Sequence, residues 1–213
     1  MSGLFNKPEV QKVDNGYGVD VLFLHGLEGS TVGSKAKHLQ QKWGAACPPM
    51  RTEDLVAKRD DCDGNWSLLD QSEKDAGLSL AYADAVSAVR YSKPDVIVGS
   101  SMGGAILFKM IAEDRYNGAA VFCAPAISNL LDTQVISRGV ERLKSMPNVW
   151  ILGELDTVVE NGHNLTTARA AGGSIIYSAE DDHRLSKAVN TGLLNSAVLT
   201  SVELLSARSI LGL

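Results

Sequence analysis

The sequence predicts an α/β fold in which a mostly parallel central sheet carries helices on both faces. Short apolar runs alternate with amphipathic stretches along the chain, which is the pattern of strands connected by helices. The apolar runs are nearly continuous, as expected for strands that are covered on both faces. The chain has 213 residues, enough for one full core, so we expect a single domain over residues 1–213.

Composition limits the classes of partner. The chain is 45% hydrophobic and 21% charged, values typical of a globular domain, and its net charge of −5 gives nucleic acid no electrostatic support. No apolar run approaches the length of a membrane span, and the first residues do not resemble a signal peptide. The three cysteines lack the spacing of metal ligands and indicate reduced thiols. We therefore expect a cytoplasmic protein with no nucleic-acid or membrane partner and no metal or cofactor; the oligomeric state is not predicted.

Five apolar runs are predicted as strands. Val10–Val13 is a candidate for a short edge strand, and residues 45–51 are a candidate for a further one. Pro48 and Pro49 interrupt the second candidate, so it favours an edge or an irregular ladder. The five predicted strands cover residues 19–24, 95–98, 119–124, 149–152 and 174–177.

Helices are predicted between these strands and at the end of the chain. A helix that opens at Ser34 has Ala36, Leu39 and Trp43 on one face. Residues 53–77 are charged and rich in glycine and aspartate, which predicts a surface excursion without the ligand spacing of a calcium loop. The remaining predicted helices cover residues 78–90 and 105–112, one amphipathic helix within 126–147, and a closing helix through 189–205.

The run at residues 96–105 contains a G-x-S-x-G turn with Ser101 at its centre. Such a turn lies between a strand and a helix and exposes the serine Oγ. Gly99 and Gly103 leave room for the helix backbone to pack against the strand. The amide of Met102 then lies at the first turn of the helix, where a developing negative charge is stabilised. An ordinary glycine-rich turn is the alternative.

Polar residues follow four of the predicted strands, and all four groups therefore meet at one edge of the sheet. They are His25 to Leu27, Ser101, Asp156 and His183. A serine hydroxyl needs a base to take its proton, and the base needs a third group to orient it. His183 is the predicted base and Asp156 the predicted orienting acid.

Other residues compete for these roles. His163 follows Asp156 closely and His38 lies on the first helix; both are predicted at the surface. Competitors for the acid are Glu154, Asp181 and Asp182.

The loop after the first strand supplies the remaining predicted site residues. The amides of Leu27 and Met102 are predicted to bind the oxyanion, since such a site needs two N–H donors. His25 and Gly26 allow a close backbone turn, and we expect His25 to hydrogen-bond the loop backbone. Glu28 is predicted either to shape the entrance and disfavour acidic substrates, or to be a solvated loop residue.

Four segments together resemble the α/β-hydrolase superfamily: LFLHGLEGS, VIVGSSMGGA, ILGELDTVV and DDHRL. They are similar to its oxyanion loop, nucleophile elbow, acid loop and histidine loop, in that order, over nearly the whole chain from Val19. The chain looks most like small bacterial serine esterases with little or no cap. The resemblance implies hydrolysis of an ester or thioester through an acyl-enzyme, with no cofactor.

The sequence leaves the substrate open. Residues 126–147 are too short for a large lid, which favours an open pocket and small or short-chain acyl esters. A thioesterase or a C–C bond hydrolase would use the same three residues. A hydrolase-like protein that binds a small molecule without catalysis is a third possibility, although binding alone would not require Ser101, Asp156 and His183 together.

Overall fold

A computed structural model describes residues 16–211, and its centre is a five-stranded sheet. Every neighbouring pair of strands runs parallel, and the spatial order of the strands follows their order in the chain. The predicted α/β class is confirmed. The carboxyl ends of all strands therefore lie along one edge. The strands are β1 (Val21–Leu24), β2 (Val96–Ser100), β3 (Ala119–Cys123), β4 (Asn148–Gly153) and β5 (Ser174–Ser178).

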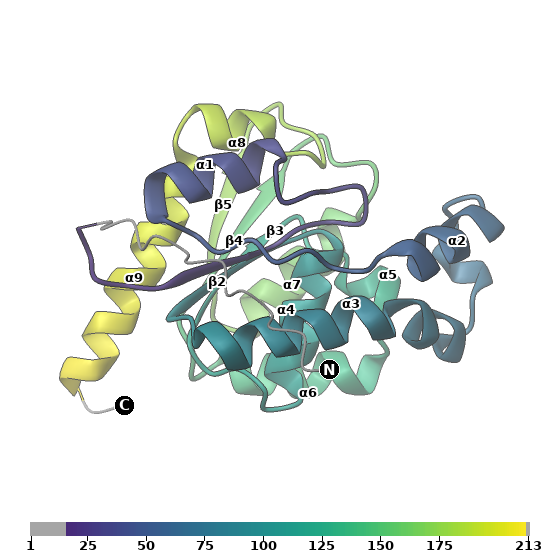
Figure 1. Cartoon of the computed structure of the whole chain (residues 1–213), viewed down its shortest axis with the longest axis horizontal. Coiled ribbons are helices and arrows are strands. Elements are labelled where there is room, and N and C mark those ends of the chain that lie inside the picture. Colours follow the sequence, from purple (N-terminus) through teal and green to yellow (C-terminus); the bar gives the residue numbers. More distant parts are fainter. Residues whose placement is uncertain (1–15, 212–213) are drawn as a thin grey trace, which may run out of the picture.

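Helices cover both faces of the sheet (Figure 1). On one face lie α1, α8 and α9, and on the other lie α3, α4, α6 and α7. No helix within residues 16–211 combines the length and the apolar character that a membrane span requires. The helices are α1 (Ser34–Trp43), α2 (Glu53–Asp61), the 3-10 helix η1 (Trp66–Leu68), α3 (Gln71–Ser92), α4 (Met102–Ala112), α5 (Ile127–Leu130), α6 (Thr133–Leu143), α7 (Asn161–Ala170), α8 (Ser186–Asn190) and α9 (Leu193–Leu211).

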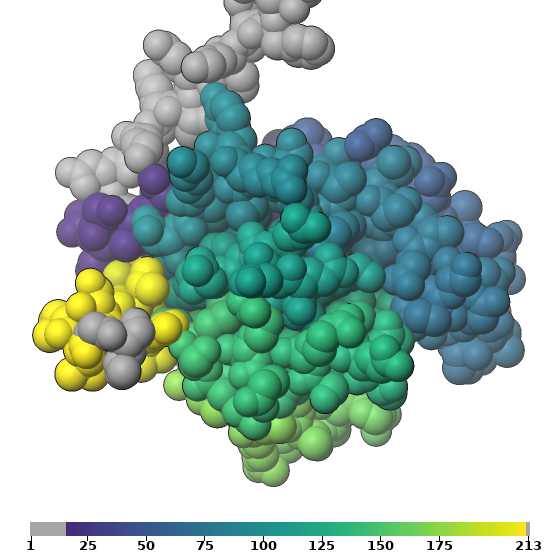
Figure 2. Space-filling model, turned by 90° about the horizontal axis from the view of Figure 1, so that it is seen from below, coloured from purple at the N-terminus to yellow at the C-terminus, as the bar shows by residue number. Residues whose placement is uncertain are grey.

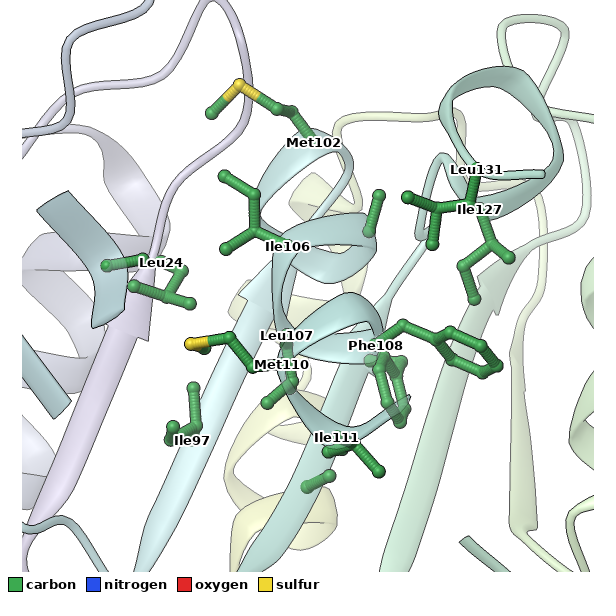
Figure 3. Packing of buried hydrophobic residues seen from close by; sticks show 14 of the residues in the cluster. Leu24, Ile97, Met102, Ile106, Leu107, Phe108, Met110, Ile111, Ile127 and Leu131 are labelled. Atoms are coloured by element: carbon green, nitrogen blue, oxygen red, sulfur yellow. The ribbon is translucent and has the colours of Figure 1, made fainter. Parts of the chain in front are cut away.

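Successive side chains of β1 to β4 enter two separate hydrophobic cores, whereas β5 is only partly buried. Ile97 and Phe122 contribute to the core beneath α3 and α4, whereas Val98 and Val121 contribute to the core beneath α1 and α9. Figure 3 shows the first of these cores around α4, of which ten of 11 residues are buried. Burial on both faces explains why β1 to β4 have nearly continuous apolar sequences.

The second candidate edge strand is confirmed only as an irregular ladder. Ala46 forms a single parallel bridge with Leu22 of β1. Its amide donates to the carbonyl of Val21 at 2.9 Å, and its carbonyl accepts from the amide of Phe23 at 2.8 Å. Pro48 follows, and proline has no amide to continue the ladder. The other candidate, Val10–Val13, lies outside the described residues.

The segment from residue 53 to residue 77 is more helical than the sequence predicts. It contains α2 and η1, and α3 begins at Gln71 instead of near residue 78. Asp70 and Glu73 form a capping box at this start: the amide of Glu73 donates to Asp70 Oδ1, and the amide of Asp70 donates to Glu73 Oε2. Figure 2 shows α2 and η1, in blue, at the end of the molecule opposite α9.

The connection from β3 to β4 also differs from prediction, because it contains two helices instead of one. The first helix ends at the C-cap residue Leu131. Asp132 caps the second: its Oδ1 accepts from the amides of Gln134 and Val135 at 2.7 and 2.9 Å. The short helix α5 packs against α4, α7 and η1, next to the carboxyl edge of the sheet. This connection therefore contributes to the surroundings of the site.

Candidate active site

Ser101 occupies the sharp bend between β2 and α4. Its φ of 53° and ψ of −116° are uncommon for a residue with a Cβ, and such a conformation costs on the order of 1–3 kcal/mol. The bend is held by its own backbone: the amide of Ser101 donates to the carbonyl of Cys123 at 2.9 Å, and its carbonyl accepts from the amide of Ala126 at 3.0 Å. The hydroxyl is therefore presented by a backbone anchored to the neighbouring strand.

The two glycines of the motif allow this bend. A Cβ on Gly99 would lie 2.6 Å from the carbonyl oxygen of Gly103, and a Cβ on Gly103 would overlap the carbonyl of Leu24. The next residue, Gly104, would place a Cβ 2.6 Å from Pro125. Helix α4 thus begins in direct backbone contact with the sheet, as predicted for this motif.

Ser101, His183 and Asp156 form one hydrogen-bonded chain. His183 Nε2 lies 2.9 Å from Ser101 Oγ, and His183 Nδ1 lies 2.8 Å from Asp156 Oδ2. The side chain of His183 is 17% exposed, whereas that of Asp156 is fully buried. The three residues come from the ends of β2, β4 and β5, so the parallel sheet brings together segments 82 and 27 residues apart in the chain.

Asp156 is held as a carboxylate. Its second oxygen, Oδ1, accepts from the amides of Val158 and Val159 at 2.9 and 3.0 Å. Burial raises the pKa of Asp156, but the hydrogen bonds from His183 and from these amides outweigh burial and hold the pKa below its usual value. A carboxylate that accepts from Nδ1–H fixes the imidazole so that Nε2 faces the serine as an acceptor.

The competing acids have other partners. Asp181 Oδ2 accepts from the hydroxyl of Ser178 and from the amide of Ala188, both at 2.8 Å. Glu154 accepts from the amide of Glu180 at 2.8 Å, and Asp182 accepts from the amide of Arg184 at 2.9 Å. These carboxylates shape the loop that carries His183 instead of contacting its ring.

The other histidines lie away from the serine. His163 is exposed on α7 and pairs with Glu160 at 3.4 Å. His38 is half-buried instead of fully solvent-facing: its Nε2 is buried and has no hydrogen-bond partner among residues 16–211, and burial together with Lys42 lowers its pKa. His25 is 6% exposed, and its Nδ1 lies 2.8 Å from the carbonyl of Gly26, as expected for a residue that supports the loop.

The loop after β1 lies directly against the serine. A Cβ on Gly26 would be 3.1 Å from the Cβ of Ser101, and the carbonyl of Gly26 accepts from the amide of Gly29 at 2.9 Å. Within residues 16–211, the amides of Leu27 and Met102 donate to no protein acceptor. Both donors of the predicted oxyanion site therefore remain available for a ligand.

Ser101 and His183 open into a cavity of about 640 Å³. Its walls include three residues of the segment 53–69 that the sequence did not connect with the site: Leu55, Arg59 and Trp66. Trp66 is the single aromatic residue of this segment, and it was the available signal in the sequence. Within residues 16–211, no group of three or more His, Cys, Asp or Glu side chains is arranged to hold a metal ion.

Glu28 has a partner that the sequence did not indicate. Arg59 Nη1 of α2 lies 2.6 Å from Glu28 Oε1, and the same guanidinium contacts Asp60 at 2.8 Å. Asp60 and the pairing with Glu28 both help to raise the pKa of Arg59. The negative charge at the mouth of the cavity is therefore paired with a cation from a distant segment.

Comparison with known proteins identifies the fold. No protein-family model and no curated protein sequence matches the chain. Solved structures do match. Est1E from Butyrivibrio proteoclasticus superposes with a TM-score of 0.61 at 12% identity, over 87% of this chain and 88% of that chain. A protein of Xanthomonas campestris pv. campestris described as a hydrolase of the alpha/beta superfamily gives 0.55 at 18% identity, over 89% and 99%.

A third match is the esterase domain of a protein from Rhodothermus marinus, with a TM-score of 0.54 at 14% identity, over 92% of this chain and 88% of that domain. These structures are hydrolases and esterases by name, and each match extends over most of both chains. The chain therefore has the α/β-hydrolase fold, as the four sequence segments predict.

Proposed function

We propose that this protein is a serine hydrolase that cleaves small-molecule carboxylic esters through an acyl-enzyme. One observation carries the proposal: Ser101 Oγ, the imidazole of His183 and the carboxylate of Asp156 form a continuous hydrogen-bonded chain at a cavity. The fold adds support, because one of the similar structures is named as an esterase domain and another is named Est1E. Asp156 contacts the ring nitrogen of His183 that faces away from Ser101, and its side chain is fully buried. A carboxylate in that position stabilises the imidazolium that forms when the histidine accepts a proton.

The proposed reaction has two halves. In the first, Ser101 Oγ attacks the ester carbonyl while His183 Nε2 takes the hydroxyl proton, and the amides of Leu27 and Met102 bind the oxyanion. His183 then gives that proton to the leaving alkoxide, which departs as an alcohol, and an acyl ester of Ser101 remains. In the second half, water loses a proton to His183 and attacks the acyl carbon, which releases the carboxylic acid and restores the serine.

The role of Asp156 in this scheme is electrostatic. It stabilises the imidazolium that forms when His183 accepts the proton, and it keeps Nδ1 protonated beforehand. His25 and Gly26 shape the oxyanion loop, and Glu28 borders the entrance.

Covalent labelling tests the proposal. A fluorophosphonate probe should label the wild-type protein, and Ser101→Ala should abolish labelling together with ester hydrolysis. Absence of labelling in well-folded wild-type protein would instead favour a binding role without catalysis. A panel of matched ester, thioester and β-diketone substrates then identifies the bond cleaved: we expect hydrolysis of the ester at the highest kcat/KM.

The cysteines support a reducing location such as the cytoplasm. None of the three forms a disulfide, and two are buried. Burial raises the pKa of Cys47 to about 11 and that of Cys123 to about 12, so both remain protonated thiols of low reactivity at neutral pH. We propose that they are structural residues without a part in the reaction.

A further inference from the structure

His183 lies in a turn that has a strained residue on each side of it. The turn connects β5 to α8 and covers residues 179–185. Glu180 has a φ of 52° and Leu185 a φ of 53°, in the left-handed region that residues with a Cβ rarely adopt. Such a conformation persists only where the surrounding structure fixes it. The contacts that hold this turn therefore decide where the imidazole of His183 lies.

Two local hydrogen bonds shape the backbone next to His183. The amide of Arg184 donates to Asp182 Oδ1 at 2.9 Å, and the amide of Leu185 donates to the carbonyl of Asp182 at 3.1 Å. Because both bonds lie within residues 182–185, they fix the shape of the turn but not its place above the sheet. Contacts from other elements must fix that place.

Other elements bind the backbone of the turn both before and after His183. Before it, the carbonyl of Asp181 accepts from the amide of Leu155, just after β4, at 2.8 Å. After it, the carbonyl of Arg184 accepts from Lys35 Nζ of α1 at 2.5 Å. Helix α1 lies beside α8 on one face of the sheet (Figure 1). Lys35 thus anchors the turn on the side that leads into α8.

Lys35 occupies a position that does not favour a lysine locally. It lies in the first turn of α1, where the helix dipole disfavours a positive charge. It is also partly buried and lines the cavity beside Ser101. Burial lowers the pKa of Lys35, and the negative charges of Asp181 and Asp182 oppose that effect. A residue that contradicts its local preference marks a place where another requirement decides, and here its contact is with the turn of His183.

We infer that Lys35 is a positioning residue for the proposed reaction: by binding the carbonyl of Arg184 it keeps His183 Nε2 within hydrogen-bonding distance of Ser101 Oγ, 2.9 Å in this structure. The inference rests on the proposed serine hydrolase function, because only a reacting serine requires this distance. Lys35 neither takes nor gives a proton, and it acts through His183. The competing explanation is that Lys35, as part of the cavity lining, contacts the substrate directly.

Steady-state hydrolysis of p-nitrophenyl acetate tests this role. Lys35→Met keeps most of the side-chain stem but removes the donor, and we expect kcat to fall about 10- to 100-fold at nearly unchanged KM, since misplacing a reacting group by about 1 Å can cost about 10²-fold. Lys35→Arg should stay within about threefold of wild type, because its guanidinium can donate to the same carbonyl. Lys37→Met is the matched control: Lys37 is exposed on the same helix and does not line the cavity, so kcat should not change.

Three results would overturn the inference. An unchanged kcat in Lys35→Met would show that the contact with Arg184 is dispensable. A loss carried by KM alone would indicate contact with the substrate. A Lys35→Met protein that fails to fold, judged by its circular dichroism, would make Lys35 a general structural residue.

A double variant tests whether Lys35 acts through His183. His183→Ala has no imidazole to position, so adding Lys35→Met should not reduce its residual hydrolysis further. A further loss as large as in the wild-type background would show that Lys35 acts on the substrate or on the fold, and it would overturn the inference.

Failure of this inference can be told from failure of the proposed function. Fluorophosphonate labelling and ester hydrolysis by wild-type protein, both unaffected by Lys35→Met, would reject only the positioning role of Lys35. Absence of labelling and of hydrolysis in well-folded wild-type protein would reject the serine hydrolase function, and the positioning role with it.

Discussion

The bend at Ser101 and the segment at residues 53–69 both border the cavity, yet they are built differently. Helix α4, which starts at the bend, has ten of 11 residues buried, and its first turn is in backbone contact with β1. In α2 the only buried residue is Leu55, and the segment reaches the site through Arg59 and Trp66. The reacting group is thus fixed by the core, whereas the surface that a substrate meets comes from a peripheral segment.

This difference has a physical basis. A nucleophile and its base must keep a distance near 3 Å, which only a densely packed backbone can maintain. The wall of a binding pocket needs only the right shape and polarity, so a segment with few buried side chains can supply it and can change without disturbing the core. The two regions should therefore respond differently to substitution.

The largest effect is expected at the buried end of the hydrogen-bonded chain. Asp156→Asn keeps the shape of the side chain but removes the charge that stabilises the imidazolium, and the amide favours the wrong tautomer of His183. We expect kcat for ester hydrolysis to fall by about 10⁴-fold. Glu154→Gln is the control, because Glu154 is exposed and contacts a loop amide instead of His183; its kcat should stay within a few-fold. Comparable losses in both variants would show that Asp156 acts only through the loop.

The same variant has a consequence for acid stability. The folded-state pKa of Asp156 lies below its ordinary value of 3.8, so the stability contributed by this carboxylate is present above that pH and is lost as the pH falls through the lower folded value. Wild-type protein should therefore lose more unfolding free energy than Asp156→Asn as the pH falls below 3.8. Urea unfolding at several pH values measures this; parallel curves for the two proteins would contradict it.

The second effect concerns the backbone contact at the start of α4. In Gly103→Ala the added Cβ would overlap the carbonyl of Leu24, and neither backbone can move without breaking the sheet. We expect a loss of about 3 kcal/mol or more in the free energy of unfolding. Gly162→Ala is the matched control, since Gly162 also lies in a helix and its Cβ would meet only Glu160 Oε1, at 3.5 Å. This control should be neutral or more stable by about 0.5–1 kcal/mol, and equal destabilisation of both variants would refute the special role of position 103.

The smallest effect is expected at the peripheral segment. Glu28→Gln removes one negative charge from the mouth of the cavity, while Arg59 keeps its contact with Asp60. Turnover of an anionic ester relative to its neutral analogue should rise two- to fivefold, because exposed ion pairs are worth at most about 1 kcal/mol. Asp60→Asn is the control, because Asp60 is also a partner of Arg59 but lies outside the cavity lining. If the charge of Glu28 at the entrance causes the change, Asp60→Asn should not reproduce it. If a general change in Arg59 causes it, both variants should show it. If the ratio of anionic to neutral ester turnover is unchanged in Glu28→Gln, Glu28 does not influence which substrates enter the cavity.

Much of the fold was predictable because it depends on local patterns. Continuous apolar runs predicted the five strands to within about two residues, and the capping box at Asp70 was a readable signal for the true start of α3. The helical character of residues 53–61 was not readable, since α2 is mostly polar and buries only Leu55. Its position is set by packing on α3, which is a tertiary contact.

The candidate site divides in the same way. Sequence patterns were enough to predict that Ser101, His183 and an acid, Asp156 or one of its competitors, meet at one edge of a parallel sheet, because strand direction fixes that edge. The folded chain was needed to show that Asp156 is the carboxylate that contacts His183, that Arg59 pairs with Glu28, and that Trp66 lines the cavity. Those choices depend on distances between segments far apart in the chain, and periodicity and spacing carry no information about such distances.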